Sequence, residues 1–191
     1  MEVKSSMRVV FAFSLILLML SGVRTQSIAP IPTDEGLDTE EYMVYSALIS
    51  ALIEQRRSHD SIELVVIADH TTKIAAPHYL SGISTQETYD SYKAKNEQPY
   101  PLKNLFDLKV KYVLVEEKES AHLDSRVFAR KYPHSLGSFL FSRIGINSAK
   151  TEALVYVERR CGFDCAQASG YQLVKGKEGW KIKSTRFLWI A

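Results

Sequence analysis

The sequence predicts an α+β domain in which a C-terminal four-stranded antiparallel meander is covered on one face by upstream helices. Three observations lead to this prediction. Residues 38–57 carry an apolar stripe at helical spacing, residues 180–190 alternate between apolar and polar side chains, and short connections join the last four predicted strands. Consecutive strands joined by short connections lie antiparallel to each other.

The first helix is expected to begin after Asp38. This residue can cap the helix, and Glu41 stands three residues later, at the second position of a capping box. Arg56 and Arg57 follow the stripe, and basic side chains are favourable at a helix C-terminus. The apolar stripe consists of Tyr42, Tyr45, Ile49, Leu52 and Ile53.

Two further helices are predicted downstream. Ser84 and Glu87 form a second capping box, which opens a polar helix that ends near Lys95. A short helix over residues 124–132 is expected to stop at Pro133, because proline cannot continue a helix.

The strands are predicted from β-branched runs and from alternation. Two strands precede the meander, at residues 62–68 (IELVVIA) and 110–115. In the last strand Trp180 and Ile182 alternate with Lys181 and Lys183, as in a half-buried strand. The four strands of the meander are expected at residues 138–146, 152–159, 170–175 and 180–190.

Residues 1–26 have the features of a secretory signal peptide. Lys4 and Arg8 precede an apolar run of about a dozen residues, and a small-residue exit follows. The run is shorter than the roughly 20 apolar residues of a membrane span, although an uncleaved anchor is the alternative. We therefore expect an exported protein, in the periplasm or outside the cell, with no membrane span after cleavage. Residues 27–37 are expected to form a flexible linker and residues 38–191 a single domain.

Charge and glycine patterns exclude several classes of function. Removal of residues 1–26 leaves 21 basic and 21 acidic side chains, because the leader holds three of the 24 basic and one of the 22 acidic residues. Nucleic-acid binding needs Lys and Arg gathered on one face, so we expect no nucleic-acid partner. The glycines are scattered and form no phosphate-binding loop or G-x-G-x-x-G motif, so no cofactor is expected.

The only two cysteines, Cys161 and Cys165, lie between the second and third strands of the meander. In an exported chain two thiols this close most often form a disulfide, and Gly162 can take up the tight turn between them. A thioredoxin-like centre would need two intervening residues at a helix start, and structural zinc would need four Cys or His ligands. A disulfide is predicted and no metal is expected; free thiols and redox or metal chemistry are the alternatives.

The C-terminal part of the chain carries the motifs FSRIGIN, ALVYV, CGFDC and GWKIK in this order. In this pattern it resembles an uncharacterised family of exported bacterial proteins. The segments EYMVYSALISAL and YPLKNLFDLKVKYVLV extend the resemblance over most of the mature chain. It implies export and supports the domain boundaries, but it implies no activity. The chain departs from the family pattern at residues 166–169 (AQAS), where a glycine-rich step is expected. The order of elements is also similar to NTF2-like or cystatin-like domains, an analogy of fold alone.

Three polar residues are candidates for chemistry. Asp69 and His70 follow the strand at residues 62–68, and a carboxylate beside an imidazole can act as a general base or supply metal ligands. Adjacent side chains on an extended chain point to opposite sides, which weakens direct cooperation between them. Arg143 stands between apolar residues of a predicted strand, so its guanidinium needs an internal carboxylate or an anion in a cleft.

Two classes of function follow from these residues. The favoured one is an exported non-catalytic module that binds a small ligand or an envelope protein through its sheet face, with Arg143, Tyr156 and Tyr171 as candidate ligand-binding residues. Aromatic residues at strand spacing more often belong to the core. The alternative is a small hydrolase or metal-assisted enzyme that uses Asp69 and His70. An enzyme needs these side chains to converge on one cleft, whereas a binding module needs only an apolar concavity.

Overall fold

The computed structural model describes residues 36–56, 61–73, 77–121, 123–162 and 164–191. The predicted signal peptide and nearly all of the predicted linker lie outside the described residues. Leu37, the last residue of that linker, is buried in the main core. In the described ranges, no helix is long and apolar enough to cross a membrane.

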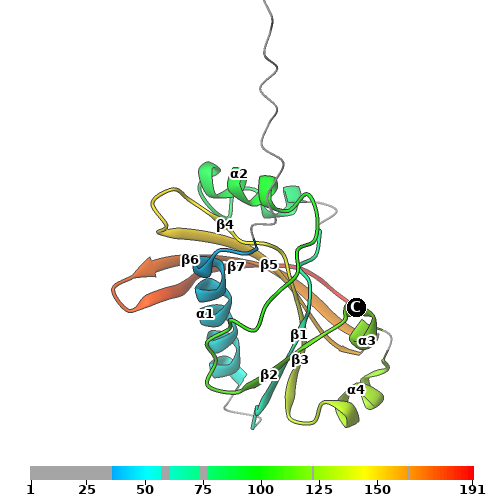
Figure 1. Cartoon of the computed structure of the whole chain (residues 1–191). Coiled ribbons are helices and arrows are strands. Elements are labelled where there is room, and N and C mark those ends of the chain that lie inside the picture. Colours follow the sequence, from blue (N-terminus) through cyan, green and yellow to red (C-terminus); the bar gives the residue numbers. More distant parts are fainter. Residues whose placement is uncertain (1–35, 57–60, 74–76, 122, 163) are drawn as a thin grey trace, which may run out of the picture. The chain divides into compact units, whose positions relative to one another are not determined.

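The described chain forms a seven-stranded mixed sheet (Figure 1). The strand order is β2-β1-β3-β5-β6-β7, and the short β4 also pairs with β5. β1 is parallel to β2 and β3, whereas β3, β5, β6 and β7 are antiparallel neighbours. The strands are β1 (Leu64–Ala68), β2 (Lys111–Val115), β3 (Ser135–Phe141), β4 (Gly145–Ile146), β5 (Glu152–Gly162), β6 (Cys165–Gly176) and β7 (Gly179–Ile190).

The predicted four-stranded antiparallel sheet is confirmed only in part. The C-terminal strands are antiparallel as expected, but the two upstream strands join the same sheet through parallel pairing. β1 lies between β2 and β3, with Leu64 opposite Lys111 on one side and Val66 opposite Ser138 on the other. A short connection predicts that two consecutive strands pair as antiparallel neighbours. A long connection does not determine which strand pairs with which.

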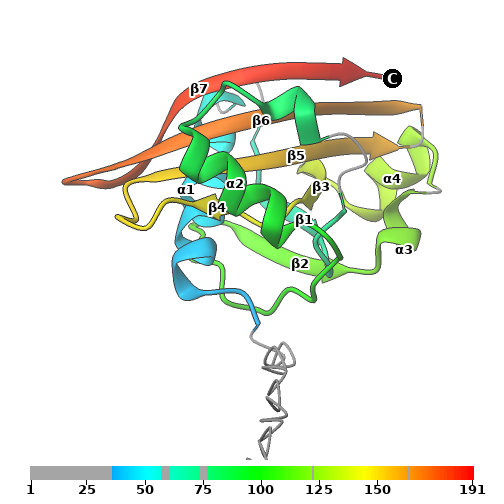
Figure 2. The ribbon, with the colours of Figure 1, turned by 90° about the horizontal axis from the view of Figure 1, so that it is seen from above.

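Helices cover both faces of the sheet, which corrects the prediction of helices on one face. Figure 2 shows α1 and α2 on opposite sides of the sheet. In β5, Ala153, Val155 and Val157 belong to the core beneath α1, whereas Leu154 and Tyr156 belong to the core beneath η1 and α2. The helices are α1 (Thr39–Arg56), the 3-10 helix η1 (Pro77–Leu80), α2 (Gln86–Lys95), α3 (Glu117–Ala121) and α4 (Ser125–Lys131).

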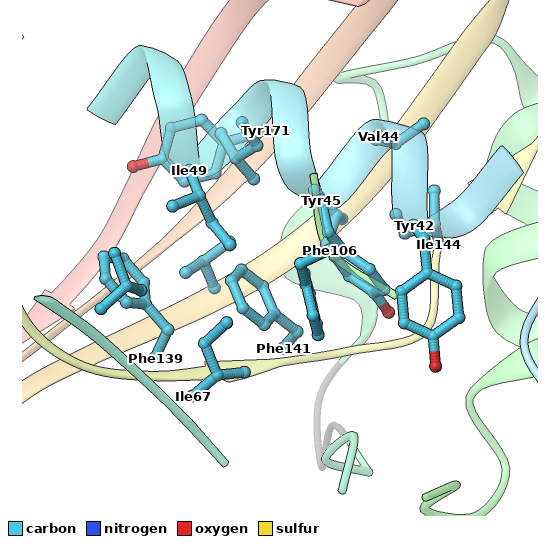
Figure 3. Packing of buried hydrophobic residues seen from close by; sticks show 14 of the residues in the cluster. Tyr42, Val44, Tyr45, Ile49, Ile67, Phe106, Phe139, Phe141, Ile144 and Tyr171 are labelled. Atoms are coloured by element: carbon cyan, nitrogen blue, oxygen red, sulfur yellow. The ribbon is translucent and has the colours of Figure 1, made fainter. Parts of the chain in front are cut away.

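The main core lies between α1 and the sheet (Figure 3). Tyr45 and Ile49 of α1 are fully buried, as are Phe139 and Phe141 of β3. The ring centroids of Tyr45 and Phe141 are 4.9 Å apart, in a tilted arrangement. The stripe predicted from helical spacing is therefore the face that α1 buries.

The two predicted capping boxes do not form. Asp38 caps α1 as expected, because its Oδ1 accepts a hydrogen bond from the Glu40 backbone N–H (3.1 Å). Glu41, predicted to complete the box, is fully buried and turns toward the sheet instead. Thr85 rather than Ser84 is the N-cap of α2.

A glutamate from β5 accepts hydrogen bonds from the first residues of α2 and from its N-cap. The carboxylate of Glu152 accepts hydrogen bonds from the Thr85 backbone N–H (3.1 Å) and from the Thr88 hydroxyl (2.7 Å). Burial raises the pKa of Glu152, but hydrogen bonds from the two threonines and from Gln172 outweigh it and lower the pKa. The contact therefore fixes the start of α2 against the sheet in the charged form of the carboxylate.

The strand predicted over residues 138–146 is interrupted at residues 142–144, between β3 and β4. Three residues of this segment lie opposite two residues of β5, so the interruption is a bulge. Asn96, at the end of α2, accepts a hydrogen bond from the Arg143 N–H (2.7 Å) and donates one to the Arg143 carbonyl (2.9 Å). Tyr45 of α1 donates to the Ser142 carbonyl (2.7 Å).

Glu41 is the centre of a buried charge cluster beside this bulge. Its side chain is 0% exposed, and its carboxylate accepts hydrogen bonds from Arg143 Nη2 (2.6 Å) and from the Ile144 backbone N–H (3.1 Å). Lys95 of α2 lies 3.2 Å away. The Arg143 guanidinium also lies over the ring of Tyr100, 4.4 Å from its centroid. Each buried charge of this cluster therefore has a partner, which offsets the cost of its burial.

We expect Glu41→Gln to lower the free energy of unfolding by about 3–5 kcal/mol, because the buried guanidinium of Arg143 loses its counter-charge. Urea unfolding measures this loss. The double variant Glu41→Gln, Arg143→Met should be less destabilised than the sum of the two single variants, and additive losses would contradict the pairing. The control is Glu97→Gln, at an exposed position, which should change stability by no more than about 0.5 kcal/mol.

Candidate functional site

Two cavities share the residues Arg56, Leu136 and Arg159. The first, of about 110 Å³, lies on the α1 side of the sheet and is called the sheet cavity below. The second, of about 680 Å³, lies between α4 and the segments that lead into β1 and β3, and is called the end cavity. The two together are called the Arg159 cleft.

Arg159 lies on the buried side of β5. Alternation along the strand places it on the same face as Val155 and Val157, which pack in the main core. Its Nη1 donates a hydrogen bond to the Leu136 carbonyl oxygen (3.2 Å). No carboxylate of the described residues pairs with its guanidinium. Burial and the positive charge of Arg56 lower the pKa of Arg159, so its surroundings disfavour the cation.

Polar groups of β6 line the sheet cavity, and exposed apolar side chains of β7 lie on the same face of the sheet. Gln167, Ser169 and Tyr171 of β6 line the cavity. In β7, Phe187 pairs with Ser169 and Ile190 pairs with Gln167, so both apolar side chains lie on the same face as the cavity. They are 59% and 72% exposed, so this face of the sheet is accessible beyond the end of α1.

The end cavity combines an apolar wall with hydroxyl groups. Phe128 of α4, its C-cap Tyr132 and Ile62, which precedes β1, form the wall, and Ser125 and Ser135 also line the cavity. Its volume falls within the roughly 300–1,000 Å³ of pockets that hold small organic molecules. A ligand with both polar and apolar parts fits this lining.

The predicted pair of Asp69 and His70 lies outside the cleft. His70 Nδ1 is 2.9 Å from Asp69 Oδ1, although adjacent side chains on an extended strand would diverge. The two side chains are 32% and 54% exposed, and neither residue lines the sheet cavity or the end cavity. Across the described ranges, no group of three or more His, Cys, Asp and Glu side chains is placed to hold a metal ion.

The predicted ligand-binding residues separate in the structure. Arg143 was expected to pair with an internal carboxylate or with an anion in a cleft. The structure shows the first of these, because Arg143 is paired with the buried carboxylate of Glu41. Tyr156 lies on the other face of the sheet, where its hydroxyl donates to Glu158 Oε2 (3.2 Å). Burial raises the pKa of Tyr156 and of Tyr171. Of these three candidates, only Tyr171 lines the cleft.

Arg159 was not predicted as a site residue, although the sequence holds a signal for it. Every second residue from Ala153 to Val157 is apolar and faces one side of the strand. Arg159 is the next residue in this series, so it faces the same side. An arginine in the register of a buried face needs a partner or an anion, the argument that singled out Arg143. What the sequence could not show is which of the two arginines has a carboxylate beside it.

The two cysteines lie at the tip of the β5–β6 hairpin, where Cys161 lines the end cavity. Their Cα atoms are 5.2 Å apart, within the roughly 4.4–6.8 Å that a disulfide spans. Gly162 has a φ of 141°, and a Cβ at this position would lie 2.4 Å from the backbone nitrogen of Ser125. The start of α4 can therefore approach the hairpin only because this residue is glycine.

We expect Cys161 and Cys165 to form a disulfide that shapes the hairpin tip. Thiol titration of the unfolded, unreduced protein should find no free sulfhydryl. The variant with both cysteines changed to serine should fold and lose less than about 2 kcal/mol of stability, because the loop that the bond closes is short. Two titratable thiols, or zinc bound in stoichiometric amount, would show that the pair has another role.

Comparison with known proteins places the chain in no family. No protein-family model matches it, and neither a curated protein nor a solved structure shows significant similarity. The resemblance to a family of exported bacterial proteins therefore stays a prediction, and the geometry of the Arg159 cleft is the evidence on function.

Proposed function

We propose that the protein is an exported, non-catalytic module that binds a small ligand in the Arg159 cleft. The observation that supports this proposal is the half-buried guanidinium of Arg159, which lines both cavities and has no carboxylate partner among the residues described. A partly buried charge is costly unless another group compensates it. A bound ligand is a group that can do so from the open side of the cleft.

The cleft is built on rigid elements. Arg159 lies in the interior of the sheet, since it is opposite Phe139 of β3 and Gln167 of β6. Strand positions of this kind hold a binding group more firmly than loops do. Pockets for small molecules are usually concave and largely pre-formed, and the size of the end cavity favours a small ligand over an envelope protein.

The alternative function, a small hydrolase or metal-assisted enzyme, has one observation in its favour. Asp69 and His70 are in hydrogen-bonding contact, as a general base and its orienting carboxylate would be. Catalysis also requires a cleft on which these groups converge with a group that stabilises charge. Arg143, the expected partner, is engaged by Glu41, so binding is the better supported function.

Filling the end cavity should weaken binding. Ala129 of α4 lines this cavity and is exposed, so Ala129→Trp adds bulk there without removing a core side chain. N-phenyl-1-naphthylamine, an uncharged dye that fluoresces in apolar surroundings, serves as the probe. We expect the unaltered protein to bind the dye with one saturable site, and Ala129→Trp to weaken binding at least about tenfold.

The matched control is Arg130→Trp. Arg130 is the next residue of α4 and is exposed, but it lines neither cavity of the cleft. Its replacement should leave the dissociation constant of the dye within about twofold of the original value. Absence of saturable binding to the unaltered protein, or equal losses in both variants, would refute the proposed site.

A further inference from the structure

We infer that the ligand of the Arg159 cleft is an anionic amphiphile, with an oxyanion group bound between Arg56 and Arg159 and an apolar body in the end cavity. This inference rests on the proposed function and adds the chemical class of the ligand. A carboxylate, sulfate or phosphate group supplies the same chemistry here, since each offers oxygen atoms in the geometry that a guanidinium fork recognises.

The first step of the argument is the contrast between Arg159 and the other arginines of β3 to β6. Arg143 is paired with Glu41, and Arg160 is hydrogen-bonded to Glu158. Arg159 has only the carbonyl oxygen of Leu136 as a hydrogen-bond acceptor in the described part of the chain. Its remaining N–H donors are available to a ligand on the side of the cleft.

The second step is the presence of another cation at the same place. Arg56, at the end of α1, lines both cavities together with Arg159. Two guanidinium groups that face one space repel each other, and the charge of Arg56 contributes to the lowered pKa of Arg159. An anion between them removes this repulsion and compensates both charges.

The third step concerns the body of the ligand. The end cavity is lined by Arg159, by the exposed Ala129 and by Phe128, Tyr132 and Ile62, which are 2%, 8% and 8% exposed. Its volume far exceeds that of an inorganic anion. Water in contact with an apolar wall is displaced favourably by an apolar group, and this gain grows with the area covered. An oxyanion alone would leave most of this volume to water, whereas an amphiphile satisfies the charge and fills the volume together.

A pair of dyes separates the charge from the apolar body. Anilinonaphthalene-8-sulfonate carries the same ring system as N-phenyl-1-naphthylamine with an added sulfonate. We expect Arg159→Gln to weaken binding of the sulfonated dye about 10- to 100-fold, because a charge-assisted hydrogen bond is lost. Binding of the uncharged dye should stay within about twofold, and Arg159→Lys should recover part of the affinity for the sulfonated dye.

A control and a second site variant keep the result interpretable. Arg130→Gln removes an exposed arginine of α4 that lines neither cavity and should leave both dyes unaffected. Arg56→Gln changes an exposed side chain at the helix end and should weaken the sulfonated dye about threefold, which provides a test if Arg159→Gln does not fold.

Competition identifies the class of ligand. Laurate and dodecyl phosphate should displace the sulfonated dye at concentrations at which dodecanol and inorganic phosphate do not. Displacement by dodecanol as well, or an Arg159→Gln variant that binds both dyes as the original does, would overturn the inference and leave the proposed function standing. Displacement by inorganic phosphate alone would show a site for a simple anion. Failure of both dyes to bind the unaltered protein would refute the proposed function itself.

Discussion

The bulge at residues 142–144 is the constraint on which the positions of both helical layers depend. The Ser142 N–H still donates to the Tyr156 carbonyl of β5, but other backbone groups of the bulge leave the regular ladder and are satisfied by side chains. Asn96 supplies these bonds from the end of α2, and Tyr45 and Glu41 supply them from α1. A continuous strand would satisfy its own backbone and would leave the Tyr45 hydroxyl and the Asn96 amide oxygen without these bonds. The bulge and the two helices therefore require one another, although they come from three separate parts of the sequence.

The contact of Glu41 with the bulge also determines where the cleft opens. Glu41 lies in the first turn of α1, and a helix rises about 1.5 Å per residue, so Arg56 lies about 22 Å further along the sheet. At that point α1 ends beside Leu136 and Val157, and the face of β6 and β7 beyond it carries the exposed side chain of Phe187. The cleft thus exists because α1 is held at its start and is too short to cover the whole sheet.

Local patterns predicted most elements of this fold, whereas contacts between distant segments could not be predicted. The stripe of α1, the end of α4 before Pro133 and the antiparallel order of β5 to β7 depend on spacing within short segments. The parallel neighbours of β1 depend on crossovers whose path the sequence does not determine. The unbroken apolar run ALVYV of β5 is typical of a strand buried on both faces, but the prediction of helices on one face did not use this signal. Glu41 and Glu152 fit local capping boxes or strand ends equally well, so only the tertiary structure shows that each reaches a distant partner.

The lack of information on distant contacts also explains why the sequence pointed to Arg143 rather than to Arg159. Arg143 and Arg159 both stand among apolar residues in strands, and the physical argument that a buried guanidinium needs a counter-charge applies equally to each. For Arg143 the fold supplies that charge from α1, and the cluster is closed by Lys95 and Tyr100. For Arg159 the residues described supply a carbonyl oxygen and a second cation, Arg56. An internal ion pair stabilises a fold without any ligand, whereas Arg159 has a neutral carbonyl oxygen as its acceptor in the described part of the chain. On the inference made above, an anionic ligand would supply to Arg159 the counter-charge that Glu41 supplies to Arg143.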